Sequence, residues 1–214
     1  MNRMYEEEYH KEKHNYLYNN EEYYLVRARI AKHDYFKYLS SEAKVLEFGC
    51  GLGQNIYLLP NRAGYDISKF AVDFCKKKGI KATTNLKSIK DNYHDIILCS
   101  EVLEHLENPL EALRQMRKKL RFIGTLVLVI PIDKWNKPNV NDVNKHFYNW
   151  NFNTITNLLV KAGFSTVEYE IIRRTGFKIL LPFSRISFGL YLFLTKLAAI
   201  LSDSKHIKIV AMKN

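Results

Sequence analysis

The stretch from residue 45 to residue 54, Val-Leu-Glu-Phe-Gly-Cys-Gly-Leu-Gly-Gln, constrains the fold of this chain more than any other. Four residues of strand character run directly into Gly49, Gly51 and Gly53. Glycine lacks a Cβ atom, so the backbone here can turn sharply and let a ligand lie against it. A helix over Gln54–Leu59 is expected next, with its N-terminus facing such a ligand. The pattern predicts a strand, a ligand-binding turn and a helix, in that order.

Two acidic residues sharpen this prediction. Glu47 lies inside the first strand, and Asp66 follows directly after a second short strand predicted over Arg62–Tyr65. A carboxylate at the end of a second strand can accept hydrogen bonds from a ribose diol. The spacing also fits a strand-turn-helix-strand unit. We therefore expect a site for a nucleoside-bearing ligand at the carboxyl ends of two adjacent strands.

The pattern Glu-x-Gly-x-Gly-x-Gly, with an acid after the next strand, resembles the class I S-adenosylmethionine-dependent methyltransferases. Glu47, the three glycines and Asp66 match it. Dinucleotide-binding folds use a related turn around a pyrophosphate, without an acid before the first glycine. A carboxylate at Glu47 would repel a pyrophosphate and suits a cationic ligand that carries an amino acid. The resemblance implies S-adenosylmethionine as methyl donor, S-adenosylhomocysteine as product, and no metal ion.

The rest of the chain alternates between short apolar segments and segments of helical periodicity. The predicted core strands are 44–48, 62–65, 81–84, 94–99, 125–130, 165–172 and 206–212, and the predicted core helices are 54–59, 69–78, 108–120 and 152–162. This alternation indicates an α/β fold with a parallel sheet covered by helices on both faces. The resemblance implies a single Rossmann-like domain of seven strands, mostly parallel, with an antiparallel last strand.

The segment before the core, residues 1–40, is polar and rich in tyrosine. Apolar residues at helical spacing between Glu21 and Leu39 predict helices there. We place an N-terminal helical cap over 1–40 and the methyltransferase core over 41–214. In the resembling family such segments often fold over the cofactor, which implies that Arg27 or Arg29 pairs with the methionine carboxylate. The alternative for both arginines is an ordinary position on a helix surface.

Further cofactor contacts follow from the resemblance. Ile67, directly after the ribose acid, would stack near the adenine. After the third strand the family often has an acid that accepts the adenine amino group. This chain has Asn85 there, followed by Leu86. An amide oxygen can accept the same hydrogen bond.

A second motif follows the fourth strand. Residues 99–106, Cys-Ser-Glu-Val-Leu-Glu-His-Leu, resemble the Glu-Val-Leu-Glu-His segment of small-molecule members of the family. The resemblance places Ser100 and Glu101 where the strand meets the cofactor and points His105 toward donor or acceptor. A structural role for Glu104 and His105, holding the loop by hydrogen bonds, is the alternative.

The loop after the fifth strand, 131–151, is long and lies at the carboxyl end of a parallel strand, where ligand sites form. Its polar and aromatic residues are Asp133, Trp135, His146, Phe147, Tyr148 and Trp150. The resemblance implies that this loop borders the acceptor. We predict His146 as the general base, because an imidazole titrates near neutral pH and can take a hydroxyl proton. Packing or capping of the loop is the alternative for His146.

The turn before the fifth strand departs from the family. Arg121-Phe122-Ile123-Gly124 stands where relatives commonly have Pro-Gly-Gly, and only the last glycine remains. We expect an altered turn there, and the departure says little about activity.

The acceptor is less constrained than the donor. The formal net charge of +11 raises the question of a nucleic acid or a membrane surface. The cations are scattered or gathered at helix ends, and no Asn/Asp-Pro-Pro-aromatic motif follows the fourth strand. Cys99 also lacks the preceding proline of cytosine C5 enzymes. These features argue against nucleic acid. The overall pattern resembles family members that act on small molecules, sugars or lipids, which implies a small-molecule, sugar or lipid-linked acceptor, methylated at oxygen. A non-catalytic cofactor-binding partner or scaffold, and a protein methyltransferase, stay open.

An apolar insert over 177–202 separates the last two predicted strands. Arg185 and Lys196 interrupt it, and a spanning helix needs roughly 20 mostly apolar residues, so a transmembrane helix is not expected. Three alternatives remain: an amphipathic helix on a membrane surface, a helix in a homodimer or substrate pocket, and a plain core element. The first residues are charged, so we expect no signal peptide and a cytoplasmic protein, with peripheral membrane contact under the first alternative. The cysteines, at 50, 75 and 99, are expected to be reduced core thiols.

Overall fold

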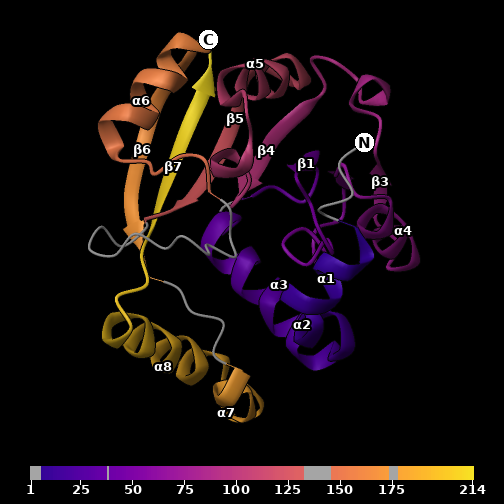
Figure 1. The fold of residues 1–214 in the computed structure, drawn as a ribbon, viewed down its shortest axis with the longest axis vertical. Helices are drawn as coiled ribbons and strands as arrows, with labels where there is room; N and C mark the ends of the chain where they lie inside the picture. The colour runs from indigo at the N-terminus through magenta and orange to yellow at the C-terminus, as the bar shows by residue number, and fades with distance from the viewer. Residues whose placement is uncertain (1–5, 38, 133–145, 174–177) are drawn as a thin grey trace.

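The computed structural model describes residues 6–37, 39–132, 146–173 and 178–214. Its seven strands form one sheet in the order β3-β2-β1-β4-β5-β7-β6 (Figure 1). The strands are β1 Val45–Phe48, β2 Arg62–Tyr65, β3 Lys81–Thr83, β4 His94–Ser100, β5 Leu120–Pro131, β6 Phe164–Ile172 and β7 His206–Lys213. The pairs from β3 to β5 are parallel, whereas β7 runs antiparallel to both β5 and β6. The predicted Rossmann-like sheet with an antiparallel last strand is confirmed.

Eight α-helices and three short 3-10 turns accompany the sheet in the described residues. The helices are α1 Glu7–Lys13, α2 Asn15–Asn19, α3 Glu21–Tyr35, α4 Lys69–Lys77, α5 Pro109–Lys119, α6 Phe152–Lys161, α7 Leu181–Ile186 and α8 Phe188–Leu201, and the turns are Leu86–Ser88, Leu103–His105 and Lys178–Leu180. An asparagine caps the start of both α5 and α6. The Asn108 side chain accepts a hydrogen bond from the Glu111 N–H, and Asn151 makes a reciprocal capping box with Thr154.

Alternation along β5 divides the core between the two faces of the sheet. Leu126, Leu128 and Ile130 belong to one buried cluster, which α5 and α6 complete. Val127 and Val129 belong to a second cluster on the other face, with residues of α3 and α4. Because successive strand residues point to opposite faces, one apolar run fills both layers.

A third cluster joins the N-terminal helices, the glycine-rich turn and the insert. It contains Tyr24 from α3, Leu52 from the turn, Leu181 from α7 and Tyr191 from α8. The Tyr24 hydroxyl donates a hydrogen bond of 2.9 Å to the Leu52 carbonyl. Figure 1 shows α1–α3 and α7–α8 at the end of the sheet toward which β6 points. The turn is therefore held by segments from both ends of the described chain.

The predicted helix Gln54–Leu59 is wrong, because this segment forms a series of turns. Its backbone bonds join residues three apart, from the Ile56 N–H to the Gly53 carbonyl and from the Leu59 N–H to the Ile56 carbonyl. Pro60 follows directly and cannot donate to a helical ladder, so fewer than two turns fit between glycine and proline.

Helix α8 is apolar on all sides. Tyr191, Thr195 and Ala199 form its buried stripe. Its large exposed apolar side chains are Leu190, Phe193, Leu197, Ile200 and Leu201. Within the described residues, no helix combines the length and the apolar character that a membrane crossing requires.

Candidate active site

A cavity of about 1060 Å³ opens at the carboxyl ends of β1 and β4, the point where the strand order reverses. Ligands of doubly wound sheets bind at this switch point. One wall is the glycine-rich turn with the acids 47 and 66, a second comes from α1–α3, and a third comes from the segments after β4 and β5. The cavity therefore joins the two motifs that the sequence placed some fifty residues apart.

Each glycine of the turn is required for its own reason. All three have positive φ, +75° at Gly49, +49° at Gly51 and +77° at Gly53. A Cβ atom at Gly49 would lie 2.3 Å from Cγ2 of Val102, and one at Gly53 would lie 2.5 Å from Cδ1 of Ile80. A Cβ atom at Gly51 would meet nothing within 4 Å, and this residue lines the cavity. The outer two glycines permit packing, and the middle one presents bare backbone to a ligand.

Glu47 is buried, with 1% of its surface exposed. Its Oε1 accepts a hydrogen bond of 2.6 Å from the Asn55 amide. Burial raises the pKa of Glu47 to about 8, against the lowering effect of the Asn55 bond and with a further rise from the nearby Asp66 charge. Oε2 of Glu47 and Oε1 of Gln54 are buried and lack a hydrogen-bond partner among the described residues. Both residues line the cavity, so it holds polar atoms that a donor group of a ligand would satisfy.

Asp66 organises the turn. Its Oδ2 accepts from the Gly51 N–H at 2.8 Å, and its Oδ1 accepts from the Ser68 N–H at 2.9 Å. Burial raises the pKa of Asp66, and these two backbone bonds act in the opposite direction. Each carboxylate oxygen has two lone-pair directions, so both can still accept a ligand hydroxyl. Asp66 lies in the cavity wall, as the ribose prediction requires.

The other predicted cofactor contacts divide into two groups. Ile67 and Leu86 line the cavity, and Ile67 is 52% exposed there. Asn85 is not among the lining residues, and its side-chain oxygen accepts the Lys87 N–H at 3.0 Å. An asparagine at the start of a 3-10 turn commonly makes this bond.

The structure distinguishes the two candidate arginines on α3. Arg27 lines the cavity and lies half-buried beside Tyr23, to whose hydroxyl its guanidinium donates at 3.4 Å. Arg29 is exposed, and its guanidinium lies over the Phe188 ring, 4.1 Å from the ring centre. Of the two, Arg27 is placed to meet a ligand.

The segment after β4 begins with a strained residue. Ser100 ends β4, and Glu101 follows with φ +56°, a conformation that is uncommon outside glycine. The Glu101 N–H donates to the Val129 carbonyl at 2.8 Å, and its carboxylate lies 3.3 Å from Nε2 of His206. All of these side chains except Val129 line the cavity. His206 was not predicted, because a histidine that opens a strand carries no motif.

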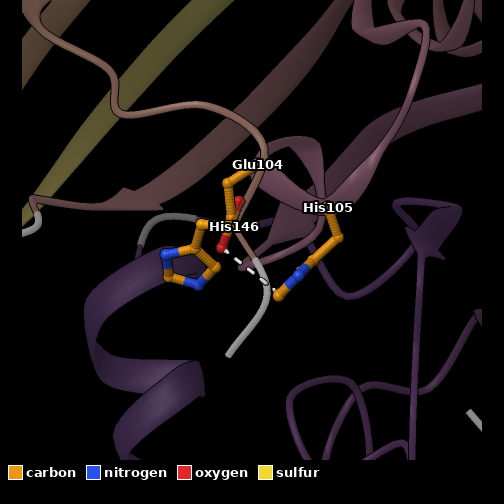
Figure 2. A group of neighbouring side chains, drawn as sticks. All are labelled: Glu104, His105 and His146. Carbon is orange, nitrogen blue, oxygen red and sulfur yellow. Dashed lines mark ion pairs between the residues drawn. The ribbon is translucent and has the colours of Figure 1, made fainter. Parts of the chain in front are cut away.

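Two histidines and a glutamate meet in the cavity wall that the segments after β4 and β5 form (Figure 2). The rings of His105 and His146 lie 4.8 Å apart between centroids, at 68° to each other. Glu104 lies behind them, 1% exposed, with its Oε1 3.9 Å from Nε2 of His105. A backbone bond of 2.8 Å from the Phe147 N–H to the Glu104 carbonyl ties the two segments together. The structure thus brings together His105 and His146, which the sequence predicted separately. The predicted loop residues Asp133 and Trp135 lie outside the described residues.

A second cavity of about 1300 Å³ adjoins the first, between α3, α8 and the outer strands β5–β7. The two cavities share Arg27, Glu101, Pro131 and His206 in their walls. Apolar residues of the second cavity include Ile30, Phe36 and Leu192, and lysine and arginine residues line it together with acids. The two cavities are therefore direct neighbours with part of their walls in common.

A family model described as a methyltransferase domain matches residues 18–169, which include the glycine-rich turn, Asp66 and both histidines. The chain belongs to this family. It is a class I S-adenosylmethionine-dependent methyltransferase, with the fold and the motif positions that this class uses.

Three comparisons place this methyltransferase among known proteins. A SAM-dependent methyltransferase from Thermotoga maritima superposes with a TM-score of 0.65 at 17% identity, covering 97% of each chain. The (4+2)-cyclase SpnF superposes with a TM-score of 0.62 at 16% identity, covering 87% of this chain and 79% of that one. An uncharacterized protein of Methanocaldococcus jannaschii is 38% identical over 90 residues, 40% of each chain, so the match spans less than half of this curated relative. At these identities the solved structures support the fold alone.

Proposed function

We propose that this methyltransferase transfers a methyl group to an oxygen atom of a small-molecule, sugar or lipid-linked acceptor. One observation carries the proposal: a cavity with the glycine-rich turn on one wall and the His105–His146 pair on another adjoins a second cavity with a mixed apolar and charged lining. The first suits a nucleoside-bearing donor, and the second suits an amphiphilic acceptor.

The residues of the first cavity fit the donor. In the proposed complex Asp66 accepts hydrogen bonds from the ribose hydroxyls, and Gly51 lets the ligand lie against the backbone. Glu47 supplies a carboxylate oxygen to a cationic group. Arg27 pairs with the ligand carboxylate, and residues 1–40 form a helical cap over the site. When bound, S-adenosylmethionine supplies an electrophilic methyl group on a sulfonium sulfur.

Ile67 and Leu86 form the proposed apolar contacts to the adenine, and the backbone of Ser100 and Glu101 borders the donor. Asn85 is the weaker proposal, because its side-chain oxygen already accepts the Lys87 N–H. An adenine contact from Asn85 would use the second lone pair of that oxygen.

His146 is the proposed general base on the acceptor side. Its ring lies against that of His105 in the cavity wall, where a neutral imidazole can take the proton of an acceptor hydroxyl. His105 then acts as a positioning residue. If this is correct, His146→Ala lowers kcat by about 10²- to 10⁴-fold while the affinity for S-adenosylhomocysteine stays within twofold.

The test of the function is transfer of a labelled methyl group from S-adenosylmethionine into fractionated host extract, separated into lipid, polysaccharide, small-molecule and protein fractions. We expect label in the lipid, glycan or small-molecule fraction, and its loss with Asp66→Ala. Label confined to protein would replace the proposal with protein methylation. Cofactor binding without label in any fraction would favour a non-catalytic role.

We also propose that α7 and α8 contact a membrane surface. Exposed apolar residues on these helices include Ile186, Phe193, Leu197 and Leu201, and the exposed Lys196 lies among them. A net charge of +11 favours anionic lipid over a second copy of the same cationic chain.

Flotation with vesicles of anionic and of zwitterionic lipid tests this contact. Phe193→Asp, at a 62% exposed position, should abolish binding to anionic vesicles. The matched control is Leu17→Met, a volume-conserving change in the third cluster, which should bind like the parent chain. Phe188 is unsuitable for this test because it packs against that cluster beneath Arg29. Concentration-dependent dimers that Phe193→Asp disrupts, without vesicle binding, would assign the face to a homodimer instead.

A further inference from the structure

Glu104, His105 and His146 form a group of metal-ligating side chains beyond the donor site. One ligand atom from each lies within 4.8 Å of those of the other two. Figure 2 shows the glutamate and the two imidazoles converging from the 3-10 turn after β4 and from the segment that precedes α6. Two nitrogen ligands and one carboxylate are the donor set of many zinc and iron enzymes.

We propose that this group binds one divalent first-row metal ion, of the Zn²⁺, Fe²⁺ or Mn²⁺ class, on the acceptor side of the cavity. Mg²⁺ and Ca²⁺ are disfavoured, because both prefer oxygen ligands and two of the three donors are imidazole nitrogens. Zn²⁺ is the probe of choice, since it accepts nitrogen and carboxylate ligands in one site.

The surroundings of the group favour a cation. Glu104 is 1% exposed, so its carboxylate is largely removed from water. The imidazoles of His105 and His146 are half-buried beside it, so a bound ion would be partly shielded from solvent. Attraction between an ion and a carboxylate is stronger in such surroundings than in water.

The backbone holds the three ligands close to a binding arrangement. The Phe147 N–H bonds to the Glu104 carbonyl at 2.8 Å, and the His105 N–H bonds to the Val102 carbonyl at 3.0 Å. Metal bonds of about 2.0–2.2 Å place tetrahedral ligand atoms roughly 3.3 Å apart, so side-chain rotations suffice to close the present spacing. The backbone thus holds Glu104, His105 and His146 in place, and their side chains can rotate to coordinate an ion after the protein has folded.

The position of the group suggests what the ion would do. Three protein ligands leave at least one coordination position open, and all three residues line the cavity that also contains the glycine-rich turn. This role rests on the proposed function. An acceptor hydroxyl bound to the ion would lose its proton to water more readily, and its oxygen would form the C–O bond as the sulfonium C–S bond breaks and sulfur takes the electron pair. With the ion bound, His146 would be its ligand and the ion would promote proton loss, so the general-base role of His146 belongs to the metal-free protein.

The test measures metal binding without any acceptor. Tag-free full-length protein is stripped with a chelator, and Zn²⁺ is titrated in competition with a chromophoric chelator. We expect one ion per chain, and a Co²⁺ complex with visible absorption of a four- or five-coordinate ion. Glu104→Gln, His105→Ala and His146→Ala should each weaken Zn²⁺ binding by more than about 100-fold, beyond the effect typical of residues that only support a ligand.

His206→Ala is the matched control, since His206 is another histidine of the same cavity outside the group. It should leave Zn²⁺ affinity within twofold. Retained binding of S-adenosylhomocysteine in every variant will show that the fold and the donor site survive. The metal site would be overturned if the parent chain bound no stoichiometric Zn²⁺. It would also be overturned if all three ligand variants bound Zn²⁺ as tightly as the parent chain. Either result leaves methyl transfer itself to be judged by the labelling experiment, with and without chelator.

Discussion

The two walls of the cavity are held in different ways. On the wall of the glycine-rich turn, the side chain of Asp66 bonds to the backbone N–H groups of Gly51 and Ser68. On the opposite wall, side chains from two separate loops approach one another, and one backbone bond between Phe147 and Glu104 ties the loops together. The first wall depends on one turn whose glycines have positive φ and whose Gly51 N–H bonds to Asp66, and the second depends on side chains from two loops that one backbone bond joins. The wall of the glycine-rich turn, which is the donor wall of the proposed complex, therefore tolerates the least variation in sequence.

The largest expected effect separates two glycines of the donor wall. Gly49→Ala should lower the free energy of unfolding by about 3 kcal/mol or more, because its Cβ atom would lie 2.3 Å from Val102 at a positive φ. Gly51→Ala should cost only about 1 kcal/mol, since its Cβ atom meets nothing, yet it should weaken S-adenosylhomocysteine binding about tenfold. Denaturant unfolding and calorimetric titration measure the two effects. Equal loss of stability in both variants would contradict the division of roles.

The next effect concerns the acid of the donor wall. Asp66→Ala should weaken S-adenosylhomocysteine binding by about 10- to 150-fold, the range expected for lost hydrogen bonds to a charged group at about 1.5–3 kcal/mol. It also leaves the Gly51 and Ser68 N–H groups without their acceptor. The control is Asp73→Ala, an acid on α4 that pairs with Lys69 away from the cavity. If both variants bind equally well, Asp66 has no part in the site.

A pH dependence distinguishes the other acid of this wall. The folded-state pKa of Glu47 is about 8 against an ordinary value of 4.5, so the folded protein holds a proton over this range that the unfolded chain has lost. Its contribution to stability is fully present below pH 4.5 and is lost as the pH rises through 8, with a slope of at most about 1.4 kcal/mol per pH unit. Glu47→Gln should remove this slope, measured by unfolding at pH 5 to 8.

The same ionisation links Glu47 to its ligand. A cationic group beside the carboxylate favours the charged form, so binding of S-adenosylmethionine should release a proton below pH 8 and tighten with rising pH, by at most about tenfold per unit. Titration calorimetry in buffers of different ionisation enthalpy counts the proton. An unchanged proton count in Glu47→Gln would assign the release to another group.

The smallest effect tests backbone conformation away from both walls. Ile123 adopts φ +58° and is 53% exposed, in the irregular first part of β5, where the resembling family commonly has glycine. Ile123→Gly should raise the free energy of unfolding by about 1 kcal/mol, because the left-handed conformation is strained for a β-branched residue. Phe122→Gly, at the exposed neighbouring position without a positive φ, should instead lower it by about 0.5–1 kcal/mol. Both are measured by thermal or denaturant unfolding.

The difference between the walls explains what the sequence could predict. The glycines and Asp66 serve a backbone shape that few residues permit, so their spacing alone located the turn. The parallel sheet could be predicted from the alternation of strand and helix segments along the chain, because each strand and helix buries a continuous apolar face. The predicted helix before Pro60 did not form, and β5 begins at Leu120, five residues before its predicted start at residue 125.

The acceptor side was predictable only residue by residue. His105 and His146 each stood out in the sequence, but their contact depends on how two loops fold against each other.

Other residues of the cavity were missed or left undecided. Asn55, which donates to Glu47, lay inside a segment predicted as a helix, and His206 carried no motif. The choice between Arg27 and Arg29 required the rotation of α3 about its axis, which its polar sequence does not specify.

The order of the sheet has a consequence for synthesis of the chain. β7 follows every other described strand in sequence but lies between β5 and β6. While the ribosome translates the 33 residues that separate Ile172 from His206, β6 and the helix packed on it have no partner strand to join. During that interval the edge of β5 is open to any extended peptide nearby. A premature stop codon just before His206 would remove β7 and leave this nascent state permanent, making the protein a substrate for chaperones and proteases.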